Sequence, residues 1–281
     1  MKISIITASY NYAQYIVETI DSVISQTYQD WELIVVDDGS SDGSVDIIKS
    51  YCGKDSRIKF FQHQNGENRG LKETILLGLE NSTGDWVAFL ESDDFFLPEN
   101  LAKKVEVIKN NPSVKLVFNK VEFLWDEQRE KSNNKRIEKR QNNLSNKKFP
   151  RNMFYDFYLR NQILTFSSVI VEKNFIKQAN FNTPIDALLD WWLWVHLAQK
   201  SEFYYLDECL TIWRLHAESY IEKAKQKQSG RVSKEAYMKL FAETHNIKIL
   251  FYVLISEVIL EIINVGKMIS EKLAHSNNKD F

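Results

Sequence analysis

Apolar residues in the first 90 positions alternate between short continuous runs and stretches with helical spacing. The continuous runs predict buried strands at residues 3–6, 32–36, 58–61 and 86–90. Between them, apolar side chains recur three and four positions apart, which predicts helices at residues 15–26, from residue 45, and at residues 71–79. This alternation predicts an α/β fold, with a mainly parallel sheet flanked by helices on both faces.

The pattern is less regular after residue 90. Strands are predicted at residues 114–118, 165–171, 203–206 and 209–213, and a helix at 187–198. Residues 126–148 are almost wholly charged or amide, so we predict a mobile polar loop there. The spacing is helical from residue 232 onward. We therefore divide the chain into an α/β domain at residues 1–220 and a helical C-terminal appendage at residues 221–281.

The predicted appendage carries an apolar stripe. Its members recur at three- and four-residue spacing: Ile247, Leu250, Phe251, Leu254, Val258, Ile262 and Val265. Such a stripe has to be buried somewhere. Basic residues before it would suit an anionic membrane surface, whereas further apolar positions beside it favour packing against protein. We expect residues 232–272 to form a homodimer contact or helical hairpin, or to lie peripherally on a membrane.

Composition narrows the class of partner. The chain has 281 residues, 44% of them hydrophobic, which is enough for a large core. Because 36 basic residues face 38 acidic ones, no excess of positive charge points to nucleic acid. Cys52 and Cys209 lack disulfide or zinc spacing. The N-terminus has no secretory signal, and Lys248, Glu257 and Glu261 interrupt the most apolar stretch, so we expect a cytoplasmic protein.

Three of the predicted strands end in polar residues, at 9–11, 37–39 and 91–94. Open α/β sheets bind ligands beyond the carboxyl ends of their strands. At the third of these ends, Glu91, Asp93 and Asp94 bring like charges together, and a bound magnesium or manganese ion would neutralise them. A solvated acidic turn is the alternative for this motif taken alone.

Other candidate residues also have structural alternatives. Asp38 could accept the imide hydrogen of a uracil ring and Tyr10 could stack on it, but they could equally be a helix cap and a core aromatic residue. Asp190 lies among leucines and tryptophans, which suits a base with a raised pKa, although an acid at a helix N-terminus is also common. Arg214 and His216 share one face of a predicted strand.

Four segments in order resemble the motifs of family 2 glycosyltransferases, which have the GT-A fold, related to the Rossmann fold. They are ISIITASYNYAQYIVETIDSVISQTYQDWELIVVDDGSSDGS, GDWVAFLESDDFFLPENL, LLDWWLWVHLA and ECLTIWRLHAES. The resemblance implies that Ser9, Tyr10 and Asp38 contact the nucleotide base. It further implies that Glu91 lies near the ribose, that Asp93 binds the metal, and that Asp190 is the general base. Ser92, between the two acids, is taken as a further donor-binding residue. Arg214 and His216 match a pair near the donor diphosphate.

The resemblance implies an inverting, metal-assisted transfer from a nucleotide sugar, with UDP-sugars favoured, to a hydroxyl of a saccharide or lipid-linked acceptor. The sequence departs from the family pattern at three places. Glu91 replaces an aspartate, Ala8 replaces a proline, and Ile75 and Leu76 replace an Arg-Asn pair. If that arginine contacts the diphosphate, Arg69, Lys72 or Arg214 has to compensate.

Two other classes of protein are considered. A catalytically silent nucleotide-sugar-binding protein of the same fold is suggested by the departures at Glu91, Ile75 and Leu76. A sugar nucleotidyltransferase or dinucleotide-binding dehydrogenase would need a Gly-rich loop after the first strand, where this chain has TASYN.

Overall fold

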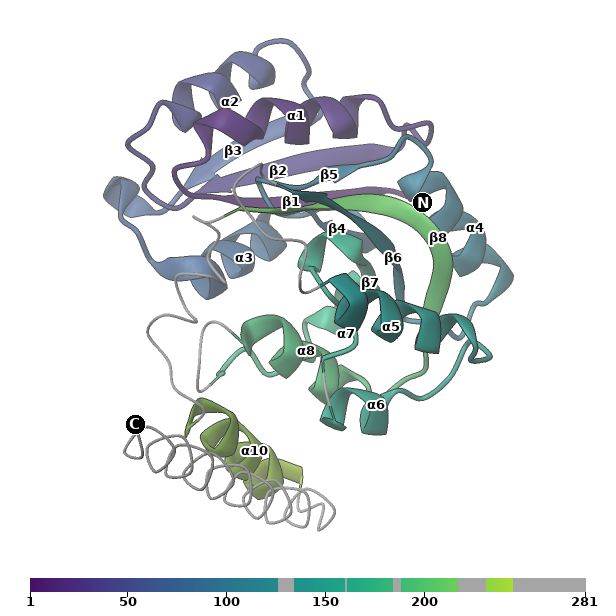
Figure 1. The fold of residues 1–281 in the computed structure, drawn as a ribbon. Coiled ribbons are helices and arrows are strands. Elements are labelled where there is room, and N and C mark those ends of the chain that lie inside the picture. Colours follow the sequence, from purple (N-terminus) through teal and green to yellow (C-terminus); the bar gives the residue numbers. More distant parts are fainter. Residues whose placement is uncertain (126–133, 160, 184–187, 217–230, 245–281) are drawn as a thin grey trace, which may run out of the picture. The chain divides into compact units, whose positions relative to one another are not determined.

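A computed structural model describes residues 1–125, 134–159, 161–183, 188–216 and 231–244 (Figure 1). The chain divides into two compact units, Met1–Lys223 and Ala224–Phe281. The boundary expected between residues 220 and 221 falls in a stretch outside the described residues, so its exact place stays a prediction.

The first unit contains one eight-stranded mixed sheet in the order β3-β2-β1-β4-β7-β6-β8-β5. Its strands are β1 (Ile3–Ser9), β2 (Trp31–Asp37), β3 (Ile58–Gln62), β4 (Trp86–Phe89), β5 (Phe95–Phe96), β6 (Leu116–Trp125), β7 (Val169–Glu172) and β8 (Phe203–Leu215). The first four strands pair in parallel, as do β6 and β8, whereas β7 is antiparallel to β4 and β6, and β5 to β8. The expected mainly parallel sheet is thus confirmed.

Helices cover both faces of the parallel strands, with α1 and α2 on one face and α3 on the other (Figure 1). The described helices of this unit are α1 (Ala13–Ile24), α2 (Ser44–Cys52), α3 (Gly70–Asn81), α4 (Asn100–Asn110), α5 (Asn134–Ser145), α6 (Phe154–Leu159), α7 (Lys173–Ile176) and α8 (Leu189–Leu197), with short 3-10 turns η1 (Gln64–Gly66) and η3 (Phe166–Ser168).

Alternate residues of β1 pack against the helices on the two faces of the sheet. Ile3 and Ile5 belong to the core cluster that includes Ile16 and Ile20 of α1. Ile6 points the other way, where Gly78 of α3 lets the backbone approach, since a Cβ at Gly78 would lie 2.5 Å from Ile6 Cγ2. A strand buried on both faces needs apolar residues at successive positions, which explains the continuous runs in the sequence.

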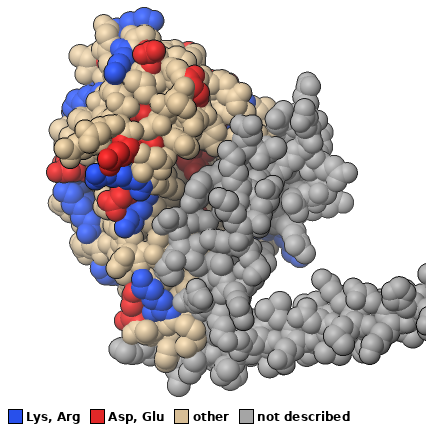
Figure 2. All heavy atoms as spheres, turned by 90° about the vertical axis from the view of Figure 1, so that its left-hand side faces the viewer, with Lys and Arg blue, Asp and Glu red and all other residues tan. Residues whose placement is uncertain are grey.

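The parallel register brings the polar strand ends to one edge of the sheet. Ser9 pairs with Asp37, and Ile6 with Phe89, so residues 91–94 continue beyond the end of β4 on the same side. Figure 2 views the molecule from the side toward which β1 runs. Basic and acidic side chains are interspersed on the part of this face that is not covered by grey atoms.

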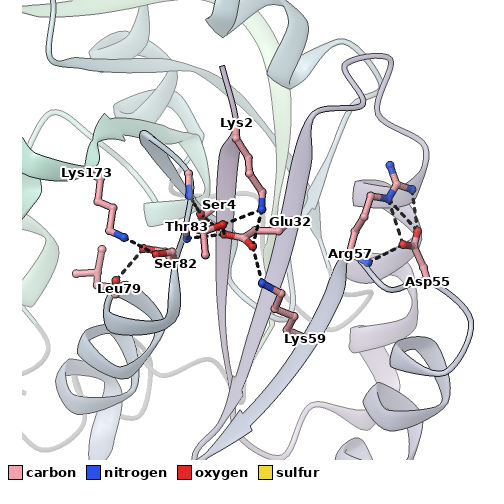
Figure 3. Close-up of polar contacts among 11 residues, drawn as sticks. Lys2, Ser4, Glu32, Asp55, Arg57, Lys59, Leu79, Ser82, Thr83 and Lys173 are labelled. Carbon is pink, nitrogen blue, oxygen red and sulfur yellow. Dashed lines mark hydrogen bonds and ion pairs between the residues drawn. The ribbon is translucent and has the colours of Figure 1, made fainter.

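At the opposite edge of the sheet, where the parallel strands begin, the buried carboxylate of Glu32 in β2 links neighbouring strands (Figure 3). It accepts hydrogen bonds from Lys2 (3.0 Å), Lys59 (2.8 Å), Ser4 Oγ (2.7 Å) and both the backbone N–H and the hydroxyl of Thr83. These donors precede or begin β1, β3 and β4. The glutamate therefore connects all four parallel strands at their amino ends.

The prediction of a mobile polar loop at residues 126–148 is wrong over Asn134–Ser145, which form α5. The helix is stabilised by contacts that hydrophobic periodicity does not register. Gln141 accepts from the Val121 N–H (2.7 Å) and donates to the Val121 carbonyl (3.0 Å), in the manner of a neighbouring strand, and Leu144 is buried. Residues 126–133 lie outside the described residues.

Two further sequence predictions need correction. The strands expected at 203–206 and 209–213 are one continuous strand, β8, which pairs with β6 through register shifts at Asn119 and Lys120. The strand expected at 165–171 begins later, at Val169, because residues 166–168 form a 3-10 turn that the Thr165 side chain caps.

In the second unit the structure describes α10 (Arg231–Thr244), in which Ala236 and Leu240, one turn apart, are buried. The apolar stripe at residues 247–265 lies outside the described residues and stays a prediction. Over the part of the chain that is described, no helix has the length and hydropathy needed to span a membrane.

Candidate functional site

The turn after β1 is joined to the loop after β2. The Asn11 N–H donates to Ser40 Oγ (2.9 Å), and Asn11 Oδ1 accepts from the Ser41 N–H (2.8 Å). Asn11 has a left-handed φ of 56°, which asparagine tolerates better than most residues. This turn leaves the Tyr10 side chain 48% exposed, as a base-stacking surface would be. The Ser9 hydroxyl is instead buried and has no hydrogen-bond partner in the described structure.

Asp38 connects the end of β2 to the start of α3. Its carboxylate accepts from the backbone N–H groups of Arg69 (2.7 Å) and Gly70 (2.9 Å). At Gly39, where φ is 86°, a Cβ would lie 2.7 Å from the Gly66 carbonyl oxygen, so the two loops touch through their backbones. Asp38 thus orders this edge; His63 Nε2 lies 3.5 Å from its Oδ1, and its Oδ2 keeps a second lone pair for another donor.

The acidic turn after β4 is fixed by two hydroxyl residues that the sequence analysis did not single out. Ser167 Oγ donates to Asp94 (2.5 Å) and accepts from the Glu91 N–H (2.9 Å). Thr165 Oγ1 bonds to Glu91 and lies 3.0 Å from Asp94 Oδ2. Asp94 is almost fully buried, and so is Ser92, whose hydroxyl has no described partner. Asp94 is therefore a structural member of the turn.

Asp93 remains partly accessible and meets the end of β8. His216 Nε2 lies 2.9 Å from Asp93 Oδ2, and Arg214 Nε donates to the Asp93 carbonyl (2.9 Å). The Arg214 N–H donates to Asp94 Oδ1 (2.9 Å). The structure thus brings the predicted residues Arg214 and His216 to Asp93, which lies more than 120 positions before them in the sequence.

Two tyrosines of the α1 region, Tyr12 and Tyr15, lie around Arg214 and His216, and the sequence analysis did not identify them. The His216 ring lies 5.0 Å from the Tyr15 ring and 5.6 Å from the Tyr12 ring, edge-on to the latter. The Arg214 guanidinium lies over the Tyr15 ring at 4.7 Å and also pairs with Glu18. Burial and the charges of Asp93 and Glu91 raise the pKa of Tyr12 well above its usual value. Both tyrosines belong to the sequence YNYAQY, and only the tertiary packing brings them next to His216.

Asp190 lies in the first turn of α8, between the buried Leu189 and Trp191. Its carboxylate accepts from the Asn161 side-chain amide (2.6 Å) and from the Trp191 N–H (2.6 Å). Burial raises the pKa of Asp190 to about 6, against the opposing effect of these donors and of Arg140. A carboxyl group with this pKa is ionised at neutral pH and is a competent proton acceptor.

The acidic groups lie close enough to interact electrostatically. Burial, and then the charges of Asp93 and Asp190, raise the pKa of Glu91 to about 8. Burial, and then the charges of Asp93 and Glu91, raise the pKa of Asp94 well above its usual range. Bringing these acids together therefore disfavours their ionised forms at this strand end.

This charge distribution fits a divalent cation. Among the described residues no group of three His, Cys, Asp or Glu side chains could hold a metal ion by itself. Magnesium and manganese, however, usually take only one or two protein ligands and complete their shell with water and substrate phosphates. Asp93, with His216 beside it, offers such a partial ligand set.

The departure in α3 leaves no arginine inside the site from that helix. Ile75 is buried with its neighbours in α3. Arg69 and Lys72, the suggested replacements, form ion pairs with Glu67 (3.3 Å) and Glu73 (2.9 Å). Arg214 contacts the acidic turn directly, with its side chain at the Asp93 carbonyl and its backbone N–H at Asp94.

Comparison with known proteins agrees with this geometry. The model of glycosyl transferase family 2 matches residues 4–166. TuaG of Bacillus subtilis strain 168, a glycosyltransferase whose name assigns it to teichuronic acid biosynthesis, is 31% identical over 220 residues, covering 76% of this chain and 79% of TuaG. Six further matched glycosyltransferases are covered only over 15 to 43% of their length.

Solved structures share the fold. TarS residues 1–349 of S. aureus, in complex with UDP-GlcNAc, has a TM-score of 0.62 at 19% identity, covering 90% of this chain and 72% of that one. A mannosyltransferase of Pyrobaculum calidifontis, in complex with GDP-Man and Mn²⁺, has a TM-score of 0.61 at 15% identity, covering 85% and 64%.

Proposed function

The chain belongs to glycosyl transferase family 2 and is a glycosyltransferase with the GT-A fold, and from this premise we propose that it is an inverting, metal-assisted enzyme. The donor is a nucleoside diphosphate sugar, with UDP-sugars favoured. The acceptor is a hydroxyl group of a saccharide or lipid-linked saccharide. Asp190 is the general base.

The observation that carries the proposal is that two other acids lie close enough to Glu91 to act on its carboxyl group. Asp93, which follows β4, and Asp190, at the start of α8, both act electrostatically on the Glu91 carboxyl group. One partly exposed carboxylate beside His216 and a second carboxylate with a pKa of about 6 therefore share one edge of the sheet. Transfer to a hydroxyl needs these two functions, one at the leaving group and one at the nucleophile.

In the proposed reaction, Asp190 accepts the proton of the acceptor hydroxyl. The hydroxyl oxygen attacks the anomeric carbon on the side opposite the diphosphate. The bond from that carbon to the diphosphate oxygen breaks, and its electron pair leaves with the nucleoside diphosphate, so configuration inverts. A divalent cation held by Asp93 would supply positive charge at the leaving diphosphate. Arg214 and His216 lie where they would support the same charge.

Recognition of the donor is assigned to the edge formed by β1 and β2. Tyr10 offers a half-exposed ring for stacking, and Asp38 retains acceptor capacity for the base. Glu91 and the main chain at Ser9 and Ser92, whose hydroxyls are buried, are proposed to complete the nucleoside pocket. The UDP and UDP-GlcNAc complexes of TarS support a uridine donor by analogy of fold, while TuaG supports a polysaccharide acceptor.

The proposal is tested with two substitutions and one assay. Asp93→Ala should abolish the dependence of UDP affinity on Mn²⁺, and Asp190→Asn should keep donor affinity while lowering turnover by about two to four orders of magnitude, the usual size of a general-base effect. Turnover is measured by UDP release with a panel of UDP-sugars and acceptors. Asp85→Ala, an exposed acid at the other end of β4, is the matched control and should behave as the unmodified chain.

The competing candidate is a nucleotide-sugar-binding protein without turnover, which the buried Ile75 favours because α3 lacks the family's arginine. In that case the unmodified chain would bind UDP-sugars in the presence of Mn²⁺ but release no UDP with any acceptor. Binding that is insensitive to Mn²⁺ and to Asp93→Ala would contradict the metal assignment instead.

A further inference from the structure

Asn161 holds the Asp190 carboxylate in one orientation. Its side-chain Nδ2 donates to Asp190 Oδ2 at 2.6 Å, while its Oδ1 accepts from the Ile163 N–H at 3.1 Å. Because the amide oxygen is already bound to an N–H group, the NH₂ end has to face Asp190. The asparagine side chain is thus fixed at both ends.

The main chain of Asn161 is anchored in turn by α5. Arg140 Nη1 donates to the Asn161 carbonyl oxygen at 2.8 Å. The adjacent Gln141 binds both backbone groups of Val121 in β6. A continuous series of hydrogen bonds therefore leads from the sheet through α5 and Asn161 to Asp190.

The charged groups that act on Asp190 are few among the described residues. Arg140 of α5 favours its ionised form, and the charge of Asp190 in turn raises the pKa of Glu91 in the acidic turn. The neutral donors are the Asn161 amide and the Trp191 N–H. Asn161 is the side-chain donor in direct contact, so it stabilises the carboxylate form that a general base requires.

We propose that Asn161 is a positioning residue for Asp190: it holds the carboxylate ionised and directed toward the acceptor hydroxyl, and Arg140 fixes Asn161 for this task. The inference rests on the proposed function, in which Asp190 accepts a proton. It adds two residues that neither the motifs nor the charge pattern of the sequence indicate, one of them from the segment expected to be a loop.

The test is the pH dependence of kcat. Asn161→Asp is nearly isosteric and can still accept from the Ile163 N–H, but it replaces the donor by a second carboxyl group. The acid limb of the kcat profile should move upward by about 1 to 2 pH units, the size expected when a charged group loses one hydrogen bond. Asn161→Ala should move it in the same direction. Near pH 6 the variants should be about tenfold slower than the unmodified chain, and above pH 9 the difference should largely disappear.

Asn152 offers a matched control. It forms the same kind of turn, with its Oδ1 accepting from the Phe154 N–H, but its amide donates to the Ala198 carbonyl instead of a carboxylate. Asn152→Asp should leave the acid limb unchanged. For Arg140, Arg140→Lys should preserve the profile better than Arg140→Gln. The donor KM should stay within about twofold in all folded variants, because none of these side chains contacts the proposed donor pocket.

A loss of kcat in Asn161→Asp that is equal at all pH values, or an unshifted acid limb, would overturn the inference. Asp190→Asn is measured alongside. If it is inactive while Asn161→Asp keeps a normal profile, only the positioning role fails. If Asp190→Asn retains turnover, the base assignment fails, and the positioning role fails with it.

Discussion

Two single residues illustrate opposite environments in this chain, one at the exposed strand ends and one in the interior. Tyr10 belongs to the first kind and Lys104 to the second. Lys104 of α4 is fully buried, and its Nζ has no hydrogen-bond partner in the described structure, lying 5.3 Å from the centre of the Phe96 ring. These two positions allow opposite predictions, one about ligand affinity and one about stability.

Tyr10→Ala should weaken UDP binding about tenfold, because stacking of an aromatic ring contributes on the order of 1 kcal/mol. Tyr10→Phe should bind UDP like the unmodified chain, since the ring remains. Titration calorimetry measures both affinities. Tyr155 is similarly exposed, at 50%, and Tyr155→Ala should not change UDP affinity. Equal affinities for Tyr10→Ala and the unmodified chain would remove Tyr10 from the nucleoside pocket.

Lys104→Met should stabilise the chain at pH 7. Burial lowers the pKa of Lys104 well below its usual value, so the folded state binds this proton less tightly than the unfolded state does. The free energy of unfolding of the unmodified chain should therefore rise with pH toward about 10.4, the unfolded pKa. The gain from methionine, about 1 to 3 kcal/mol at pH 7, should shrink over the same interval.

Denaturant unfolding at pH 7 and pH 9.5 measures this difference. Lys103→Met is the control, because Lys103 is the partly exposed neighbour on α4, paired with Glu208, and its replacement should change little. A Lys104→Met variant that is less stable at pH 7 would show that the buried amine is charged.

At the scale of elements, the amino ends of the parallel strands depend on Glu32. Burial alone would raise the pKa of Glu32, but the hydrogen bonds from Lys59, Ser4 and Thr83 outweigh burial and hold it well below its usual value. A carboxyl group whose folded pKa is lowered adds stability above its unfolded pKa, and this stability is lost as pH falls.

Glu32→Gln should therefore lower the free energy of unfolding by about 2 kcal/mol at pH 7. This value is smaller than for a fully buried ion pair, because Lys2 and Lys59 are more than a third exposed. The difference from the unmodified chain should shrink as pH falls below about 4.3. Chemical denaturation at pH 7 and pH 3.5 tests this. Glu172→Gln, at the exposed pair with Lys115, should have a much smaller effect.

The elements show where sequence patterns are informative. The strands β1 to β4 and helices α1 to α3 follow directly from hydrophobic spacing, because each buries a full face or stripe. Helix α5 does not, since its described contacts are those of Gln141, Leu144 and Arg140. Side-chain hydrogen bonds to distant backbone have no periodic signature, and so the element that supports Asp190 was expected to be a loop.

The candidate site likewise contains residues that the sequence indicated and residues that it did not. Residues in motifs, such as Asp93, His216 and Asp190, could be named from the sequence because their chemistry and resemblance coincide. Thr165, Ser167 and Asn161 could not, because serine, threonine and asparagine are common everywhere and only the fold brings them to the carboxylates. Conversely, the buried hydroxyls of Ser9 and Ser92 show that a position in a motif does not determine where its side chain points.

For the whole molecule, the two units should be separable. Every described site residue lies between Ser9 and His216, inside the unit Met1–Lys223. A chain that ends after Gly230 should therefore bind UDP with a Kd within about threefold of the full chain. Gel filtration and sedimentation with vesicles containing anionic lipid should show a loss of either oligomeric state or membrane association. Failure of the truncated chain to fold would show that the C-terminal unit belongs to the catalytic core.

The hydrogen bond from the Arg214 N–H to Asp94 joins residues 120 positions apart. During synthesis, the acidic turn of residues 91–94 emerges long before β8 can reach it, and closing so long a loop delays the contact further. A nascent chain released before residue 216 would contain the strands of the nucleotide edge but not the pair that faces Asp93. We therefore expect the first unit to be inactive until it has been synthesised as far as residue 216, because only then can Arg214 and His216 reach the acidic turn.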